Sequence, residues 1–361
     1  MRPVHALGVF IPIAIALELF HASPVLVFSA AALGVIPCAA VMGEATEAIA
    51  ARTGPGIGGL LNVTFGNAPE LIIAFFALIE GLQEVVKASI VGSIIGNILL
   101  VLGAAMLVGG FKREKQSFSR TAAHAQSAML LLALAALILP ALFQLIHGGG
   151  LPHVGEARAD FGKDLEHLSL GVALVLLVSY GAGLLFSLRT HRDVFNPYGA
   201  EQEDEQEPGW SLGRAGAFLA VSALLVGVMS EILVGSIQDA SKDIGLSQFF
   251  VGVFVVAIVG NAAEHWVAVL VAAKDKMDLA VNIAIGSSAQ VALFVAPILV
   301  LLSFVVGPDP MALVFNGYEL GGLLFAVLIA NLVTQEGESN WFEGVQLLAL
   351  YAVLGLVFFY A

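Results

Sequence analysis

Apolar stretches of membrane-spanning length recur along the whole chain, separated by short polar segments. Each is close to the roughly 20 residues that a helix needs to cross a hydrocarbon core about 30 Å thick. The alternation typical of barrel strands is absent, so helices are the expected spanning elements. We therefore predict an all-α polytopic membrane protein with eleven transmembrane helices. Their predicted ranges are 5–20, 24–42, 58–82, 86–110, 122–146, 167–188, 213–236, 248–273, 279–304, 311–333 and 342–361.

The composition supports this fold class and excludes several functions. Of the 361 residues, 59% are hydrophobic and 12% are charged, which is too apolar for a soluble protein of this size. The formal net charge is −13 and no basic stripe is present, so nucleic acid is not an expected partner. Cys38 is the single cysteine, so an internal disulfide is excluded. The N-terminus resembles a signal peptide, but Glu18 and the lack of a clean cleavage site favour a retained helix.

Two short motifs inside the apolar stretches carry the most information about function. GNAPE occupies 66–70 and GNAAE occupies 260–264, and a Gly-Ser pair follows each, at 92–93 and 286–287. Every position in the second half lies 194 residues after its counterpart. A carboxylate at bilayer depth costs free energy and is rarely present without a function. Two in matched settings indicate a duplicated transporter whose halves meet at one ion site.

The spacing of the motifs divides the chain into four parts. We expect an N-terminal helix in 1–22, a first five-helix repeat in 23–189, an acidic cytoplasmic linker in 190–210 and a second repeat in 211–361. Five helices per repeat is an odd number, so the second repeat must enter the membrane from the opposite side. The linker contains Glu201, Glu203, Asp204, Glu205 and Glu207. It is either a solvated loop or a segment that attracts cations or regulates the protein.

The distribution of Lys and Arg predicts the orientation. If the 111–120 loop is cytoplasmic, eleven of the 15 basic residues fall on the same side. The N-terminus is then cytoplasmic and the C-terminus is outside. A cell membrane is the expected location, or an organelle or vacuole membrane if the source is eukaryotic.

The first motif combines a carboxylate with residues that weaken a helix. Asn67 and Glu70 are three apart and share one helical face. Gly66 permits a break, and Pro69 leaves one carbonyl without its helical partner. Asn261 and Glu264 repeat the spacing, but Ala263 replaces the proline. The second break must therefore depend on Gly260, or be milder.

The helices that follow the motifs add further oxygen donors. Ser93 and Asn97 share one face in the first half, and Ser287 and Gln290 share one in the second. Carboxylates, amides, hydroxyls and freed carbonyls are hard donors that suit Ca²⁺, whereas Zn²⁺ or Cu would need His or Cys clusters. The alternative is that the small residues and the serines serve helix packing. The predicted cation-binding and proton-coupling residues are Glu70, Glu264, Asn67, Asn261, Gly66, Gly260, Ser93 and Ser287, with Glu70 and Glu264 as the metal ligands.

Other polar residues have candidate roles around this site. Asn97, Gln290 and His265 form a predicted secondary polar shell. His265 follows Glu264 directly and so points away from its face, either as a proton-coupling group or as a buried hydrogen-bond partner. Acidic mouths concentrate cations, so ion access or gating is the role predicted for Glu44, Glu47, Glu231 and Asp239. Ordinary solvation of helix ends is the alternative for these four.

At these motifs the chain resembles the cation/proton exchanger family, the Ca²⁺/H⁺ antiporters of the wider Ca²⁺/cation antiporter superfamily. The matching text lies at 43–81, which contains GNAPE, at 86–103, which contains GSIIGN, and at 259–303, which contains GNAAEH and GSSAQ. Na⁺/Ca²⁺ exchangers usually carry a Thr-Ser pair where Asn67-Ala68 stands here. The resemblance implies Ca²⁺ transport driven by a proton gradient. It also implies Glu70 and Glu264 as ion ligands, surrounded by Asn67, Asn261, Ser93 and Ser287.

The expected mechanism is competition between Ca²⁺ and protons at one site. Two ionised glutamates bind a divalent cation, and two protonated ones leave the site neutral, so at least two protons exchange per Ca²⁺. Alternating access would come from helices 24–42 and 213–236 sliding across the site. The expected partners are Ca²⁺ as transported substrate, protons and the lipid bilayer; no cofactor is expected, and an oligomer is possible.

Three other functions compete with this prediction. Na⁺/H⁺ or K⁺/H⁺ exchange would use the same oxygen-rich site. A cation channel would typically need rings of repeated subunits or loops. An intramembrane metalloenzyme would need a His-rich set such as HExxH, which the sequence lacks. We therefore predict a transporter and not an enzyme.

Overall fold

The protein is an assembly of helices in a computed structural model that describes residues 3–155, 161–190 and 210–361. The helices are η1 (Pro3–Val9), α1 (Phe10–Leu19), α2 (Pro24–Gly66), α3 (Ala68–Ile79), α4 (Gln83–Ile95), η2 (Gly96–Val101), α5 (Leu102–Gly110), α6 (Arg120–Ile146), α7 (Lys163–Leu185), η3 (Phe186–Thr190), α10 (Leu212–Ile244), α11 (Gln248–Phe250), η4 (Val251–Val256), α12 (Ala257–Ala273), α13 (Met277–Gln290), η5 (Val291–Val295), α14 (Ala296–Ser303), α15 (Gly317–Val333) and α16 (Trp341–Phe359). The strands are β1 (Gln116–Ser117) and β2 (Glu338–Ser339).

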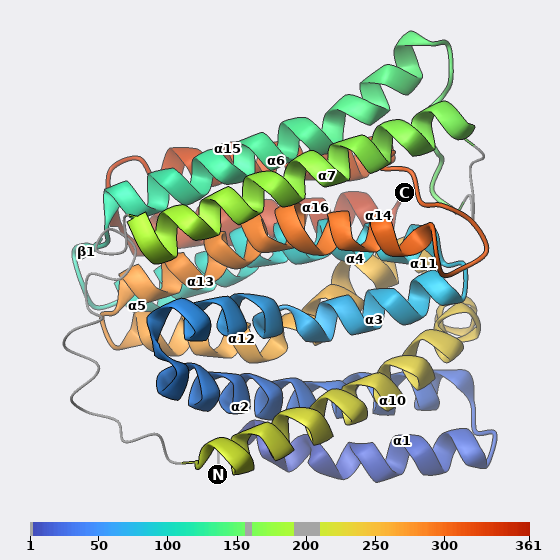
Figure 1. The fold of residues 1–361 in the computed structure, drawn as a ribbon, viewed down its shortest axis with the longest axis horizontal. Helices are drawn as coiled ribbons and strands as arrows, with labels where there is room; N and C mark the ends of the chain where they lie inside the picture. The colour runs from blue at the N-terminus through green and yellow to red at the C-terminus, as the bar shows by residue number, and fades with distance from the viewer. Residues whose placement is uncertain (1–2, 156–160, 191–209) are drawn as a thin grey trace.

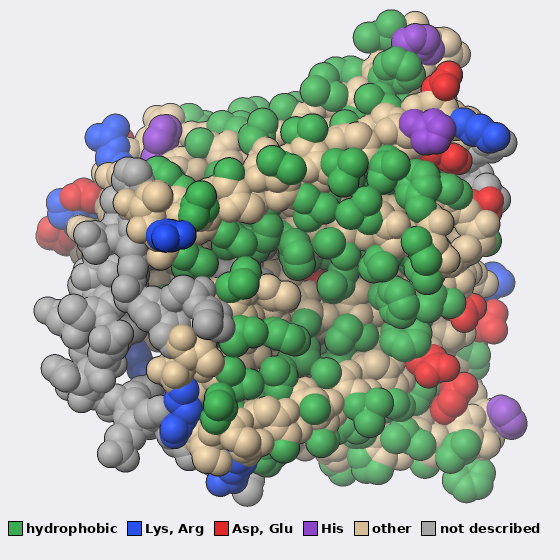
Figure 2. Space-filling view, in the orientation of Figure 1, with side chains coloured by type: hydrophobic (Ala, Val, Ile, Leu, Met, Phe, Trp, Pro, Cys, Tyr) green, Lys and Arg blue, Asp and Glu red, His purple; other side chains and the backbone are tan. Residues whose placement is uncertain are grey.

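The predicted number of membrane-spanning segments is confirmed within the described residues. Eight helices are long and apolar enough to cross a membrane, and three shorter apolar helices lie at Val4–Leu19, Ala68–Ile79 and Gly317–Val333. The helices run side by side (Figure 1). Figure 2 shows hydrophobic side chains over the middle of the molecule, with charged side chains gathered toward the two ends of the helices. Such a surface belongs in a lipid bilayer.

The second predicted helix is longer than expected. We predicted an end at 42, but α2 remains helical to Gly66. It is not straight, because a Cβ added at Gly58 would lie 2.3 Å from the carbonyl oxygen of Ala50. Residues eight apart in a straight helix are separated by about 12 Å. The chain therefore folds back on itself before it enters α3, as the blue segment in Figure 1 shows. Hydropathy marks where a chain leaves the membrane, and not where its helical hydrogen bonding stops.

The helix predicted at 311–333 begins six residues late. Residues 311–316 are buried but not helical, and α15 starts at Gly317. Side-chain hydroxyls replace helical partners here: Ser303 Oγ accepts from the Met311 amide at 2.8 Å, and Ser169 Oγ accepts from the Leu313 amide at 2.9 Å. A capping box between Asn316 and Glu319 then fixes the first turn of α15.

Short π-helical turns interrupt several membrane helices. The segment η2 follows α4, and η5 follows α13, at nearly equivalent places under the 194-residue offset. Each turn accommodates an extra residue and changes the direction of the side chains beyond it, and such turns are frequent at functional sites. The apolar sequence gave no sign of these turns.

A small sheet joins two connections at one end of the bundle, where we predicted only loops. β1 and β2 pair antiparallel, with Gln116 opposite Ser339. Lys115 Nζ donates to Glu338 Oε1 at 2.7 Å beside the pair. That hydrogen bond raises the pKa of the exposed Lys115 ammonium group. The α5–α6 and α15–α16 connections are thereby linked.

The helices α2 and α10 pack along one another at the edge of the molecule, with α1 beside them (Figure 1). Part of this contact is a separate apolar cluster that contains Cys38, Met42, Ala68 and Val226. The main core includes residues of α4, α5, α12 and α13, and both α2 and α10 also contribute to it. α10 continues to Ile244, eight residues beyond its predicted end, and stops at Gly245, whose φ of 78° suits glycine.

Candidate functional site

The first glutamate is placed by a break between two helices. α2 ends at Gly66, Asn67 leaves helical geometry with ψ of 15°, and α3 begins at Ala68. Pro69 lies in the first turn of α3, where its missing N–H costs no hydrogen bond. Glu70 lies in the same turn and is only 9% exposed. The predicted break in the first motif is therefore present.

The second glutamate lies on an unbroken helix. α12 runs from Ala257 to Ala273 through both Gly260 and Glu264. Its irregularity lies upstream, in the π-helical η4. Position 263 is not proline, and the helix is continuous there. We predicted either a break at Gly260 or a milder irregularity, and the structure has no break at Gly260.

Each glutamate packs against the glycine of the opposite motif. A Cβ added at Gly260 would lie 3.0 Å from Glu70 Cγ, and one added at Gly66 would lie 3.4 Å from Glu264 Oε1. The two carboxylates are also close enough to interact electrostatically. The glycines therefore allow α3 and α12 to bring both acids into one interior region.

The asparagines and serines also pair across the two halves. Ser287 Oγ donates to Asn67 Oδ1 at 3.1 Å, and Asn261 Nδ2 donates to Ser93 Oγ at 3.0 Å. All four side chains are at most 5% exposed. Under the 194-residue offset Asn67 corresponds to Asn261 and Ser93 to Ser287, so the two pairs are counterparts of each other. Ser288 Oγ lies 3.5 Å from the carbonyl oxygen of Ile94, its own counterpart under the same offset.

The two halves differ in how the acids are bonded. Glu264 Oε2 accepts from Ser287 Oγ at 2.9 Å. Within the described residues, neither carboxylate oxygen of Glu70 has a hydrogen-bond partner, and neither does Asn261 Oδ1. A cavity of about 10 Å³, close to the size of one water molecule, borders Glu70 and Ser93. Three buried acceptor oxygens are thus available to a cation or to hydrogen-bond donors.

The predicted secondary shell is close to these groups. Gln290 Oε1 accepts from Asn67 Nδ2 at 2.5 Å, so Gln290 bonds a predicted cation ligand directly. His265 Nε2 lies 3.0 Å from Asn97 Oδ1. His265 is partly buried, and this contact is compatible with either of the two roles predicted for it. The sequence offset had already paired Gln290 with Gly96, which has no side chain to match it.

The donor set contains few classical metal ligands. In the parts of the chain that the structure describes, no three His, Cys, Asp or Glu side chains are grouped so as to hold a metal ion. The available donors are two carboxylates with amide and hydroxyl oxygens. This chemistry fits a hard cation that binds briefly and is released, and it does not fit a resident zinc ion.

The four predicted access residues lie on α2 and α10. Glu44 lies 3.6 Å from His5 Nε2, and Asp239 lies 3.8 Å from Lys242 Nζ. The Asp239 side chain is 70% exposed, which favours ordinary helix-end solvation for that residue. Glu231 and Glu47 are both exposed. The acidic residues of the linker, from Glu201 to Glu207, lie outside the described residues.

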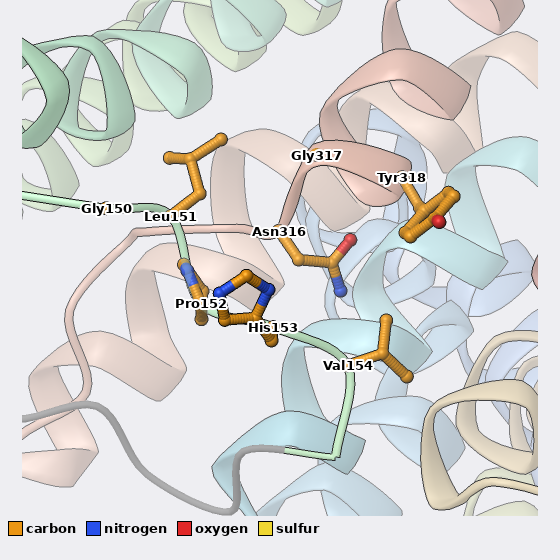
Figure 3. Close-up of a pocket in the computed structure, with 8 residues that line it drawn as sticks. All are labelled: Gly150, Leu151, Pro152, His153, Val154, Asn316, Gly317 and Tyr318. Atoms are coloured by element: carbon orange, nitrogen blue, oxygen red, sulfur yellow. The ribbon is translucent and has the colours of Figure 1, made fainter.

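A larger hollow of about 520 Å³ lies elsewhere in the molecule. The loop at 150–154 forms one wall, and Asn316, Gly317 and Tyr318 form the other (Figure 3). His153 and the Asn316 amide face each other across it. Neither glutamate borders this hollow, so size alone does not locate the candidate site.

Comparisons with known proteins support one family. The profile of the sodium/calcium exchanger protein family matches residues 23–189 and 215–360. A Ca²⁺/H⁺ antiporter of Aphanothece halophytica is 44% identical, over 97% of this chain and 94% of that protein. The Ca²⁺/H⁺ antiporter ChaA of Bacillus subtilis is 42% identical, over 97% of this chain and 96% of that protein.

Solved structures agree with the sequence comparisons. The structure of native YfkE superposes with a TM-score of 0.83 at 37% identity, and 98% of each chain is covered. The H⁺/Ca²⁺ exchanger CAX superposes with a TM-score of 0.71, over 99% of this chain and 91% of that one, at 12% identity, which shows a shared fold. The chain is therefore an all-helical, multi-pass membrane transporter that belongs to the sodium/calcium exchanger family, among its Ca²⁺/H⁺ antiporter members.

Proposed function

We propose that this protein exchanges Ca²⁺ for protons across a membrane, and that Glu70 and Glu264 bind either ion in turn. The observation that carries the proposal is the meeting of two interior carboxylates, each against the glycine of the opposite motif. Buried acceptors without donors are costly. The unbonded oxygens of Glu70 and Asn261 favour a site that a cation or protons complete.

Competition between the two ions follows from electrostatics. Two nearby carboxylates repel each other when both are ionised, and a divalent cation relieves that repulsion. Protonation of both acids removes the charge that attracts Ca²⁺. At least two protons then exchange for each Ca²⁺. The same Ca²⁺/H⁺ exchange is named for the relatives that are 42% and 44% identical over nearly the full chain.

Access to the site would alternate through movement of α2 and α10. The two helices pack mainly against each other at the edge of the molecule, which supports movement as a pair. In this scheme residues 23–189 and 211–361 form two inverted repeats, with an N-terminal helix in 1–22 and the linker in 190–210. The cell membrane is the proposed location, with the N-terminus in the cytoplasm.

The test is Ca²⁺ uptake into proteoliposomes whose interior is acidic. We expect radioactive Ca²⁺ to accumulate with the wild type and not with Glu264→Gln or Glu70→Gln, because each variant loses a charge that the cation requires. Glu80→Gln is the matched control, since Glu80 is exposed at the end of α3.

The outcomes separate the competing functions. Normal uptake by both site variants would falsify the proposed ligands. Proton-driven uptake of Na⁺ or K⁺ without Ca²⁺ uptake would reassign the substrate. Unitary currents in a voltage-clamped bilayer would indicate a channel.

A further inference from the structure

The glycines of the two Gly-Ser pairs are equivalent in sequence but have different neighbours. A Cβ added at Gly92 would clash with the carbonyl oxygen of Val253 and lie 2.7 Å from its Cα, so α4 and η4 touch there backbone to backbone. At Gly286 the three nearest atoms in the described chain belong to the Gln126 side chain, at 3.4, 3.8 and 3.9 Å from the added Cβ. One glycine is therefore packed against a helix backbone, and the other is covered by a side chain.

The next contact between α4 and η4 shows the same difference. Gly252 of η4 packs on α4, because a Cβ there would lie 2.8 Å from Ala88 Cβ and 3.3 Å from the carbonyl oxygen of Val85. The counterpart of Gly252 under the 194-residue offset is Gly58. A Cβ at Gly58 would instead clash with the carbonyl oxygen of Ala50, on the same helix. The part of α2 that corresponds to η4 is thus packed back on α2.

Gln126 covers both positions on which this part of α2 would otherwise pack. The offset relates Ala88 to Asn282 and Gly92 to Gly286, and both counterparts lie on α13. Gln126 comes from α6. Its Nε2 donates to Asn282 Oδ1 at 2.8 Å, and the same amide group packs on Gly286. Two contacts that η4 makes in one half of the protein are replaced in the other half by a single glutamine.

This polar pair is present in one half only. The counterpart of Gln126 is Leu320 and that of Asn282 is Ala88, and neither side chain can form a hydrogen bond. The Gln126 amide is also incompletely bonded, because its Oε1 is buried and has no hydrogen-bond partner within the described residues. A buried acceptor without a donor costs free energy, so Gln126 can leave this place at a small net cost.

We propose that Gln126 is a latch that keeps α2 off the surface of α13 formed by Asn282 and Gly286. When Gln126 leaves, the part of α2 that contains Gly58 packs on this surface, as η4 packs on α4 in this structure. The latch matters only if the two repeats exchange arrangements during transport, so its role rests on the proposed function. Gln126 is then a positioning residue that sets which side of the site is closed.

The latch lies on the side of the site that faces β1. α13 starts beside β1, where the Ser119 amide donates to the Asp278 carboxylate. Asn282 and Gly286 follow about one and two helical turns after Asp278, and Ser287 comes next. The latch would therefore govern access from the β1 end, which the excess of basic residues predicts to be cytoplasmic.

The first experiment measures the distance between two spin labels in the purified full-length protein without Ca²⁺. The labels are attached at Arg52→Cys on α2 and Lys276→Cys before α13, both exposed positions, with Cys38→Ala as background. The counterparts of these positions, 246 and 82, adjoin α11 and α4, which pack together. A shorter distance therefore reports α2 packed on α13.

Three substitutions shift the two arrangements in a predicted order. Gly92→Ala strains the existing contact with Val253 and should make the shorter distance appear. Addition of Gln126→Ala removes the latch, so the ratio of the shorter to the longer distance should rise about fivefold. Addition of Gly286→Ala should instead lower that ratio about tenfold, because the new Cβ would meet the arriving α2 backbone.

Ser127→Ala is the matched control, since it removes another buried side-chain hydrogen bond of α6, the one to Thr334. It should leave the ratio unchanged. An unchanged ratio after Gln126→Ala, or an equal rise after Ser127→Ala, would overturn the inference. The same holds if the longer distance alone is found in every variant. Because no Ca²⁺ is present, the result does not depend on which cation is transported.

The second experiment separates a latch from simple packing, by Ca²⁺ uptake into proteoliposomes. Uptake by Gly286→Ala should fall about tenfold while its thermal unfolding stays near that of the wild type. If Gly286 only makes room for Gln126, the double variant with Gln126→Ala should recover uptake. The latch predicts no recovery, because α2 is then the obstacle, so recovery would overturn it. Absence of uptake by the wild type would refute the proposed function instead, and the distance measurement would still decide the role of Gln126.

Discussion

At the scale of single residues, the approach of each glutamate to the opposite glycine limits what the site tolerates. The space at Gly260 is the tighter one, since a Cβ there would lie 3.0 Å from Glu70 Cγ and 3.7 Å from its Cα. At Gly66 the corresponding neighbour is the flexible carboxylate end of Glu264, at 3.4 Å. The two glycines are equivalent in sequence but unequal in packing.

We expect Gly260→Ala to be more damaging than Gly66→Ala. Overpacking against the Glu70 stem should lower the free energy of unfolding by about 1–3 kcal/mol and reduce Ca²⁺ uptake, whereas Gly66→Ala should have a smaller effect on both. Gly235→Ala on α10 is the control, because nothing lies within 4 Å of the added Cβ. Thermal unfolding in detergent and uptake in proteoliposomes would be measured together. Equal losses in both site variants would contradict the packing argument.

The sequence identified which residues meet but not how they are bonded. Glu70 and Glu264 stand out because a carboxylate in an apolar stretch is costly, and their asparagines and serines follow from helical spacing. Spacing cannot reveal that Asn67 and Asn261 present different amide atoms to their serines. Asn67 Nδ2 instead donates to Gln290 Oε1, a contact that spans 223 residues of chain. Contacts of this range are set by tertiary packing alone.

At the scale of helices, the non-helical segment 311–316 is held by hydrogen bonds from side chains to its backbone, and not by helical hydrogen bonds. Lys87 is 7% exposed, and its Nζ donates to the carbonyl of Val314 at 2.9 Å. The buried Glu319 carboxylate at the start of α15 interacts with it electrostatically. Lys87 therefore ties α4, which carries Ser93, to the segment before α15. The Asn316–Glu319 capping box was visible in the sequence and could have placed the start of α15.

Substitution of Lys87 by Met should destabilise the protein. The Val314 carbonyl would lose its donor and Glu319 its cationic neighbour, so we expect a loss of about 1–3 kcal/mol. The double variant Lys87→Met with Glu319→Gln should recover part of this loss, because the buried acid is then neutral. Lys163→Met, at an exposed position, is the control. A double variant as unstable as the sum of the single ones would show that the two groups are not coupled.

Hydropathy predicted the helices better than their irregularities. All eleven predicted spans have an apolar helix as counterpart in the described residues, and eight of these helices are long enough to cross a membrane. The π-turns at η2 and η5 need one extra residue, which leaves no mark in an apolar run. The fold-back within α2 was missed because a helix can continue through residues too polar to span the membrane.

At the scale of the whole molecule, the charges separate along the helix direction. Most of the Lys and Arg side chains visible in Figure 2 lie at its left end, where β1 also lies in Figure 1. The excess of basic residues predicts that this end faces the cytoplasm.

Cysteine labelling would test this orientation. With Cys38 buried and replaced by Ala, we would introduce Lys276→Cys at the α12–α13 connection and Lys163→Cys at the start of α7. An impermeant maleimide added to intact cells should label Cys at 163 and spare Cys at 276. The opposite pattern would reverse the orientation, and labelling of both from one side would contradict the arrangement of the spans.

The contact between Ser288 and Ile94 has a mechanical consequence. These residues are counterparts under the 194-residue offset, and in the proposed arrangement of two inverted repeats a residue can touch its own counterpart only close to the axis that relates them. If the two repeats exchange conformations during transport, atoms close to this axis are displaced least. Ser287 is the next residue in the chain. Its contacts with Asn67 and Glu264 therefore lie beside the part of the protein that such a motion displaces least.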